Sequence, residues 1–162
     1  MRDGAAAPRP LEGVTVVDLT RALAGPFATM ILADLGADVV KVEPLPDGDM
    51  VRGWGPFDRG IGVYFLSVNR NKRSIAVDFR DPRGLAVIRD LLAAADVVVD
   101  NFKPGTMERM GLGDAALEAL NPRLVRCSIS GFGSEGPYGS RPGFDQVAQG
   151  MSGLMSITGA AD

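Results

Sequence analysis

The clearest hydrophobic pattern lies near the N-terminus and predicts a strand–helix–strand unit. Residues 14–17 are all β-branched, which is typical of a strand buried on both faces of a parallel sheet. After Gly25-Pro26, where we expect proline at the first helical position, apolar residues recur at helical spacing. Gly36 supplies a left-handed residue to end this helix, and residues 39–42 follow as a second apolar strand. The unit therefore predicts two parallel strands joined by a helix.

The alternation of strand and helix patterns continues along the chain. Further strands are predicted at residues 74–79, 97–99 and 124–129, helices at 82–95, 104–111, 114–120 and from about 144, and a short turn or helix at 63–68. We expect a long loop at residues 44–60, and Asp81-Pro82 as the start of the helix at 82–95, whose buried stripe is residues 85, 88, 91, 92 and 95. This order is typical of the α/β class with a doubly wound, mostly parallel, Rossmann-like sheet and helices on both faces. Ligands bind such sheets outside the carboxyl ends of the strands, so we expect the site at residues 18–25 and from Glu43 onward.

Composition favours a single domain. The 162 residues are 46% hydrophobic, enough for one core, and we expect a loose tail at residues 1–10 before a domain at 11–162. A net charge of −3 gives no electrostatic case for nucleic acid or a membrane, and no apolar run is long enough to span a bilayer. The single cysteine, Cys127, lies in a predicted strand, so we expect a small buried side chain and a reducing cytoplasm.

The chain contains no histidine, which excludes several kinds of catalytic site. Serine–histidine–aspartate and cysteine–histidine machinery cannot form, and neither can the usual zinc sites. Acid–base chemistry must therefore fall to carboxylates, lysine or tyrosine. The sequence Asp47-Gly48-Asp49 suggests calcium, but the rest of an EF-hand loop is missing. We interpret it as a solvated turn and expect no metal site.

Two features could bind a phosphate. The loop at residues 20–25 lacks the G-x-G-x-x-G fingerprint of NAD and FAD sites; it is either a plain strand–helix turn or a helix start that receives a phosphate. The basic run at residues 69–73 is most simply a solvated loop, but Arg80, Lys103 and Arg109 also follow predicted strands. A polyphosphate ligand would explain several cations at one edge, and a nicotinamide cofactor would explain them too.

Ordered motifs over nearly the whole chain resemble the family III CoA-transferases. They are Leu11-Glu12-Gly13-Val14, Asp18-Leu19-Thr20-Arg21, Ala24-Gly25-Pro26, and residues 35–43, 71–74, 99–102, 104–105, 109–111, 131–133, 136–137, 141–145 and 149–150. This group includes formyl-CoA and carnitine-CoA transferases, and the α-methylacyl-CoA racemases are its relatives. The chain is similar to the N-terminal portion of these longer enzymes.

The resemblance implies an enzyme that transfers coenzyme A (CoA) between carboxylic acids, with acyl-CoA and a carboxylic acid as partners and no permanently bound cofactor. In the family an aspartate attacks the thioester and forms an aspartyl intermediate, which is covalent catalysis without metal or histidine. The resemblance puts that nucleophile beyond Asp162, which we assign to a turn. It also implies an interlocked homodimer for the full-length enzyme.

The resemblance also implies which residues contact CoA. Carried over by position, they are Leu23, Ala24, Val77, Asp78, Phe79, Arg80, Asn101, Phe102, Lys103, Arg109, Pro142, Gly143, Phe144 and Asp145. These residues lie on the loop edges that the fold prediction selects.

Three alternatives stay open. In the racemases a histidine follows the glycine that matches Gly143; here that position is Phe144, which argues against a racemase. A nucleotide-dependent oxidoreductase would need the glycine fingerprint and an acidic partner for the ribose, and both are missing. A non-catalytic module that binds CoA or a partner subunit is favoured if 162 residues are the whole gene product.

Overall fold

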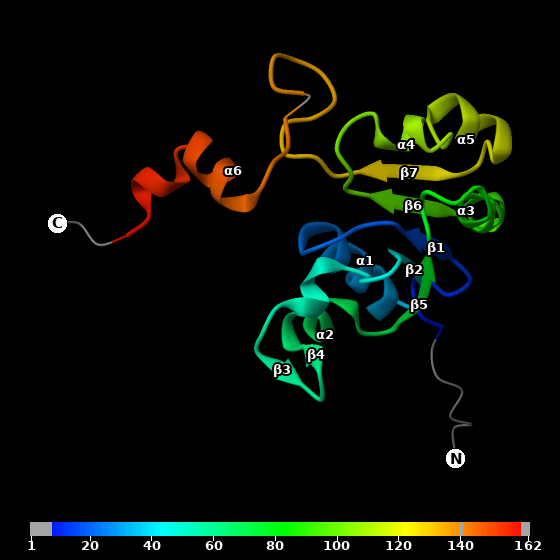
Figure 1. Ribbon diagram of the computed structural model, residues 1–162, viewed down its shortest axis with the longest axis horizontal. Helices are drawn as coiled ribbons and strands as arrows, with labels where there is room; N and C mark the ends of the chain where they lie inside the picture. The colour runs from blue at the N-terminus through cyan, green and yellow to red at the C-terminus, as the bar shows by residue number, and fades with distance from the viewer. Residues whose placement is uncertain (1–7, 140, 160–162) are drawn as a thin grey trace.

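The computed structural model of the chain describes residues 8–139 and 141–159, and its centre is a five-stranded sheet (Figure 1). The strands are β1 (Thr15–Asp18), β2 (Asp38–Pro44), β5 (Lys72–Val77), β6 (Val97–Asp100) and β7 (Val125–Ser128), in the spatial order β5-β2-β1-β6-β7. Every neighbouring pair is parallel, which confirms the predicted doubly wound α/β class. The predictions for residues 1–7 of the tail and for Asp162 lie outside the described residues.

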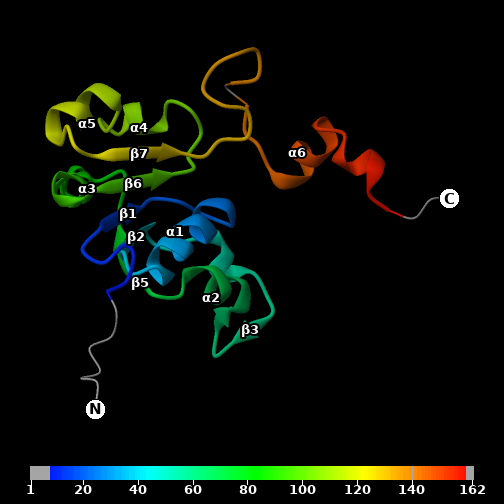
Figure 2. The ribbon, with the colours of Figure 1, turned by 180° about the vertical axis from the view of Figure 1, so that it is seen from behind.

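Helices flank the sheet on both faces (Figures 1 and 2). One face carries α1 (Ala24–Asp34) with α2 (Val63–Asn69) packed against it, and the other carries α3 (Pro82–Ala94), α4 (Thr106–Arg109) and α5 (Asp114–Leu120). The stretch predicted as a long loop contains η1 (Met50–Gly53) and an antiparallel hairpin of β3 (Phe57–Asp58) and β4 (Ile61–Gly62). The last elements, α6 (Asp145–Met151) and η2 (Leu154–Ile157), project away from the sheet. In the described part of the chain, no helix has the length and apolar character that crossing a bilayer requires.

Alternate strand residues enter two cores, one on each face of the sheet. Val17 and Val98 belong to the larger core, which lies under α3 and α5. Val16 and Val99 belong to a smaller core with Ala33 of α1. Because successive side chains of a strand point to opposite faces, the two cores explain why these strands are apolar at every position.

Helix α3 follows its predicted pattern. The Asp81 carboxylate accepts a hydrogen bond from the Arg83 N–H at 2.8 Å, and Pro82 occupies the first turn. Ile88 and Leu92 are fully buried on the predicted apolar stripe. The sequence signals at both the start and the buried face of this helix are confirmed.

Helix α1 differs slightly from its prediction. The helix begins at Ala24, so Pro26 occupies the third helical position rather than the first. Proline is tolerated there because the N–H groups of the first turn have no partner within the helix. Gly36 adopts a left-handed φ of 107° just after the helix, as predicted.

The prediction that Cys127 is buried is wrong. β7 is an edge strand of the sheet, and all four of its residues are exposed. Val125 is 59% exposed, so no described helix covers its face of the strand. An apolar strand pattern predicts burial only where helices cover both faces, and an edge strand need not meet that condition.

Candidate functional site

The candidate site lies at the carboxyl edge of the sheet. The strand order reverses between β1 and β6, and in doubly wound sheets the crevice at such a reversal receives the ligand. The loop after β1 starts at Leu19 and the loop after β6 at Asn101. These two loops therefore form the centre of the candidate site.

Asn101 binds the main chain of Arg21 across this crevice. Its Oδ1 accepts a hydrogen bond from the Arg21 N–H at 2.8 Å, and its Nδ2 donates to the Arg21 carbonyl at 2.7 Å. The two residues are 80 positions apart in the sequence. The predicted contact residue Asn101 thus joins the two loops, and its amide keeps one N–H for a ligand.

The guanidinium of Arg21 lies beside a pair of aromatic rings. Its Cζ is 6.0 Å from the ring centre of Phe79 and 5.6 Å from that of Phe102. The two rings meet edge to face, with centres 6.2 Å apart. Their contact brings together the predicted site residues after β5 and those after β6.

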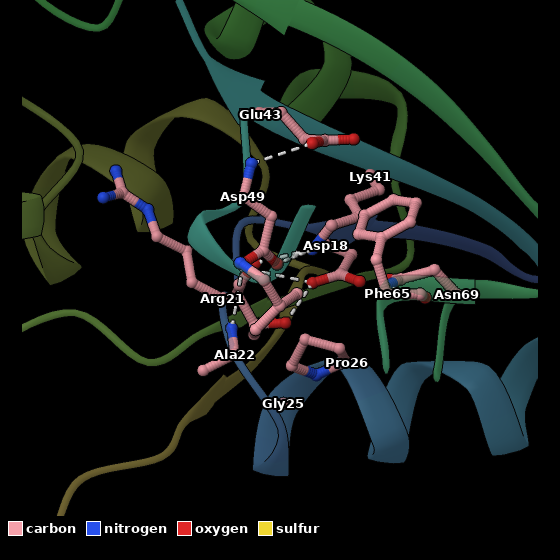
Figure 3. A network of polar contacts seen from close by, with 12 residues as sticks. Asp18, Arg21, Ala22, Gly25, Pro26, Lys41, Glu43, Asp49, Phe65 and Asn69 are labelled. Carbon is pink, nitrogen blue, oxygen red and sulfur yellow. Dashed lines mark hydrogen bonds and ion pairs between the residues drawn. The ribbon is translucent and has the colours of Figure 1, made fainter. Parts of the chain in front are cut away.

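The Arg21 guanidinium is available to an anion. Within the described residues it makes no hydrogen bond or ion pair, and its Nε is buried without a partner (Figure 3). A guanidinium stacked on aromatic rings is well suited to bind phosphate or carboxylate, because its N–H fork stays free. Arg21 was absent from the predicted contacts, although its position between a strand end and a helix start pointed to it.

The start of α1 lies two residues further along the same loop. Leu23 and Ala24 are exposed there, and the helix start has no side-chain cap and no acidic residue in its first turn. Its first N–H groups are therefore free to meet a negative charge. Gly25 permits close contact between helix and loop, since a Cβ on it would lie 2.3 Å from the Thr20 Cβ.

The predicted cations Arg80, Lys103 and Arg109 are exposed on three segments. Arg80 follows β5 and Lys103 follows β6, while Arg109 belongs to α4 and donates to the Thr106 hydroxyl at 2.8 Å. None of the three makes an ion pair with a carboxylate in the described residues. Their charges are thus free, although no hydrogen bond or ion pair in the described chain joins them to one another.

The cations of the basic run at residues 69–73 pair with carboxylates of the protein itself. Arg70 and Arg73 form exposed ion pairs with Asp34 and Asp38. Lys72 turns inward, and its side chain is 2% exposed. The predicted solvated loop is therefore correct for the two arginines and wrong for Lys72.

A buried network of charged side chains supports the loop after β1 (Figure 3). Lys41 lies 2.9 Å from Asp49, and Lys72 lies 3.0 Å from Asp18. The four side chains are at most 2% exposed. The solvated turn predicted around Asp49 is therefore wrong, because Lys41 holds this carboxylate in the interior. Across the described residues there is no group of three or more carboxylates or cysteines able to hold a metal ion.

Burial and pairing oppose each other at Asp18 and Lys72. Burial alone would raise the pKa of Asp18, but Lys41, Lys72 and the hydroxyls of Thr20 and Thr29 together hold that pKa below its usual value. Burial lowers the pKa of Lys72 to about 8, although the attraction of Asp18 counteracts part of this effect. At neutral pH the pair is charged, and its charges are balanced within the protein.

Glu43 anchors the turn that follows β2. Arg52 donates two hydrogen bonds to its carboxylate, at 2.6 and 2.7 Å, and the Asp49 N–H donates a third at 2.9 Å. Burial acts to raise the pKa of Glu43, but Arg52, the Ser74 hydroxyl and this N–H lower it to about 2. The Arg52 guanidinium also stacks 3.8 Å from the ring centre of Phe65. Glu43 therefore holds both Arg52 and the main chain of Asp49.

The Gly-rich loop after β7 closes on itself. A Cβ on Gly143 would lie 2.3 Å from the Gly131 Cα, so only glycine fits at this contact. Gly143 thereby contacts Gly131, which follows the end of β7 by three residues at the carboxyl edge of the sheet. Phe144 is 65% exposed and Asp145 begins α6, which leads away from the sheet. No hydrogen bond or ion pair in the described residues links 142–145 to the loop of Arg21.

Comparison with known proteins identifies relatives with the same organisation. Residues 11–162 match the family described as CoA-transferase family III. The chain is 54% identical over 155 residues to the succinyl-CoA:glutarate CoA-transferase of Mus musculus, over 95% of this chain and 36% of that protein. It is 48% identical over 160 residues to the succinate–glutarate CoA-transferase of Agrobacterium fabrum, over 94% of this chain and 40% of that protein.

A solved structure agrees with these matches. The crystal structure of a CAIB/BAIF family protein from Brucella suis superposes with a TM-score of 0.91 at 49% identity, over 96% of this chain and 42% of that chain. The chain spans 36% and 40% of the length of the two curated relatives. Sequence and fold agree from residue 11 onward, and this chain belongs to the CoA-transferase family III.

Proposed function

We propose that the intact protein is a CoA-transferase, which moves CoA from an acyl-CoA thioester to a free carboxylic acid. The observation that carries this proposal is family membership over residues 11–162, together with 54% identity to an enzyme named for that reaction. An oxidoreductase reading of the Rossmann-like sheet has no such support. A module that only binds CoA would share the site and lack the reaction.

Residues 11–162 form the CoA-binding unit in this proposal. The carboxyl edge of the sheet presents the exposed cations Arg80, Lys103 and Arg109, and we add Arg21 to this set because its guanidinium is unpaired. Charged N–H donors suit the phosphates of CoA, with each charge-assisted hydrogen bond worth about 1.5–3 kcal/mol. The free N–H groups at Leu23 and Ala24 can add to this attraction.

The covalent step needs a carboxylate, and the family resemblance assigns it to an aspartate outside these 162 residues. The carboxylate attacks the thioester carbonyl, the C–S bond breaks, and an acyl–aspartyl anhydride and CoA thiolate result. The thiolate then attacks the aspartyl carbonyl, forms an enzyme thioester and releases the donor acid. The acceptor acid repeats both steps in reverse. CoA must stay bound throughout, which explains a site built around its phosphates.

Dicarboxylic acids of four to five carbons are the substrate class that we propose, since two relatives are named for succinate and glutarate. The racemase alternative lacks its acid–base histidine, because Phe144 occupies that position and the whole chain has no histidine. Transfer without loss of the α-proton is therefore expected.

We also propose that the intact protein is an interlocked homodimer in a reducing cytoplasm. The exposed apolar side chains of α6 and η2, among them Val147 and Met151, support the first part because they need a cover. The exposed free thiol of Cys127 supports the second, since exposed thiols persist in reducing compartments.

An acceptor comparison tests the proposed reaction. The intact protein is incubated with succinyl-CoA and either glutarate or valerate, which has the same chain length with one carboxylate fewer. We expect glutaryl-CoA to form and valeryl-CoA to stay absent, as followed by liquid chromatography and mass spectrometry. Release of free CoA without a new thioester would contradict transfer. Deuterium exchange at the α-carbon of a 2-methylacyl-CoA would favour the racemase instead.

A further inference from the structure

The loop segment 20–22 has a backbone conformation that requires support. Ala22 adopts a φ of 65°, in the left-handed region that residues other than glycine rarely enter. Its neighbours Thr20 and Arg21 make no main-chain hydrogen bond to another main-chain group in the described residues. Regular secondary structure therefore does not determine the shape of this segment.

Side chains from three other parts of the fold hold the loop segment 20–22. The Lys41 ammonium donates to the Thr20 carbonyl at 2.8 Å, and Asp49 Oδ1 accepts from the Ala22 N–H at 3.2 Å. Asn101 holds the residue between them, Arg21, through both of its main-chain groups. Each residue of the segment is thus held by a side chain that comes from β2, from the turn after β2 or from the loop after β6.

Stability alone does not explain why two of these side chains are charged. Lys41 and Asp49 are both 1% exposed, so each has lost its hydration. A buried ion pair of this kind is often no more stable than an apolar pair of the same volume. What the charged pair provides, and an apolar pair could not, is a hydrogen bond at each end of the loop segment 20–22.

We propose that Lys41 and Asp49 are positioning residues for the CoA site. They hold the loop segment 20–22 in its strained form, which directs the Arg21 side chain toward the rings of Phe79 and Phe102. The same geometry brings the start of α1 to the carboxyl edge. This inference rests on the proposed function in naming CoA as the ligand, but the rigidity of the segment can be measured without CoA.

The test compares Asp49→Asn, which keeps the size and removes the charge, with Leu92→Ala, which removes a fully buried side chain of α3. Hydrogen exchange is followed on the peptide covering residues 19–23, and CoA affinity is measured by calorimetry on the intact protein. We expect Asp49→Asn to speed exchange in this peptide and to raise the Kd for CoA at least tenfold. Leu92→Ala should lower the melting temperature at least as much as Asp49→Asn does. It should nevertheless change the exchange rate of this peptide and the Kd for CoA by no more than about twofold.

Ala22→Val leaves the buried pair intact and serves if Asp49→Asn does not fold. A β-branched side chain resists the left-handed conformation, so it should also weaken CoA binding. Unchanged exchange in residues 19–23, or faster exchange with unchanged CoA affinity, would overturn the positioning role. The positioning role would also be overturned if Leu92→Ala sped exchange and raised the Kd for CoA as much as Asp49→Asn does. A wild-type protein that binds no CoA refutes the proposed function, while the exchange data still decide on the support of the segment.

Discussion

Arg21 and Arg126 show what makes an arginine available to a ligand. Arg126 lies on β7 and pairs with Asp114 and Glu118 of α5, so its charge is already balanced. Arg21 has no carboxylate partner in the described chain and stacks on aromatic rings. The two residues are of the same type, and their neighbours in the fold decide that one guanidinium is paired and the other is not.

Arg21→Ala should therefore weaken CoA binding, whereas Arg126→Ala should not. Loss of one charge-assisted contact of about 1.5–3 kcal/mol corresponds to about a tenfold or larger rise in Kd. Calorimetric titration of the intact variants with CoA measures the change. If both variants bind CoA as the wild type does, Arg21 is outside the site.

Glu43 makes stability depend on pH in acid. The unfolded chain takes up this proton near pH 4.5, but the folded protein holds its pKa at about 2. Between these values the unfolded state binds more protons, so stability falls as the pH falls. The shift corresponds to about 3 kcal/mol, fully present above pH 4.5. Urea unfolding at pH 7 and pH 2.5 should show a smaller acid loss for Glu43→Gln than for the wild type, and equal losses would contradict this assignment.

At the scale of elements, the contact between Gly131 and Gly143 brings the chain back toward the end of β7 just before α6 begins. A methyl group on either residue would overlap the main chain of the other, which cannot yield as a flexible side chain would. The contact returns the chain to the carboxyl edge after a loop of mixed composition. The position of the predicted contacts at residues 142–145 therefore depends on two glycines rather than on hydrogen bonds.

Gly143→Ala should open this loop, while Gly150→Ala should be tolerated. Gly150 lies within α6, and a Cβ there meets only the Met155 sulfur at 3.6 Å, so alanine should favour the helix. Limited proteolysis within residues 131–143 measures the opening, and we expect cleavage to be faster only in Gly143→Ala. Equal cleavage of the two variants would mean that the glycine contact does not hold the loop.

At the scale of the whole molecule, the C-terminal elements carry large exposed apolar side chains. Val125 on β7, Phe144 before α6 and Met151 within it are each more than half exposed, and Ile157 of η2 is 81% exposed. Large exposed apolar side chains on elements that project from the sheet, as α6 and η2 do, are typical of an interface. β7 is also the edge strand of the sheet, so in the described chain no further strand pairs with the N–H and C=O groups on its outer side.

The isolated 162-residue chain should accordingly associate with itself. Size-exclusion chromatography with light scattering should show species larger than a monomer, and Met151→Ser combined with Ile157→Ser should reduce them. Val87→Ser, on the exposed side of α3, is a control that removes an apolar residue 40% exposed outside this surface. A monodisperse wild-type monomer would contradict this expectation.

Local sequence patterns encode the strands of the main sheet, the helices beside them and their order. Runs of β-branched residues, the Asp81-Pro82 signal and Gly36 act within a few positions, so the pattern contains them directly. Alternation of strands and helices is typical of parallel sheets, so the α/β class also followed, and with it the edge at which such sheets bind ligands. This is why most predicted site segments are found at the carboxyl edge.

Which charged groups stay unpaired depends on contacts between residues far apart in the sequence. Lys72 pairs with Asp18, which lies 54 residues earlier, and Asn101 binds Arg21 across 80 residues. Such contacts depend on the order of strands in the sheet and on the reach of each side chain, and neither is encoded in local periodicity. The exposure of Cys127 has the same origin, because a strand is buried only when other elements cover it.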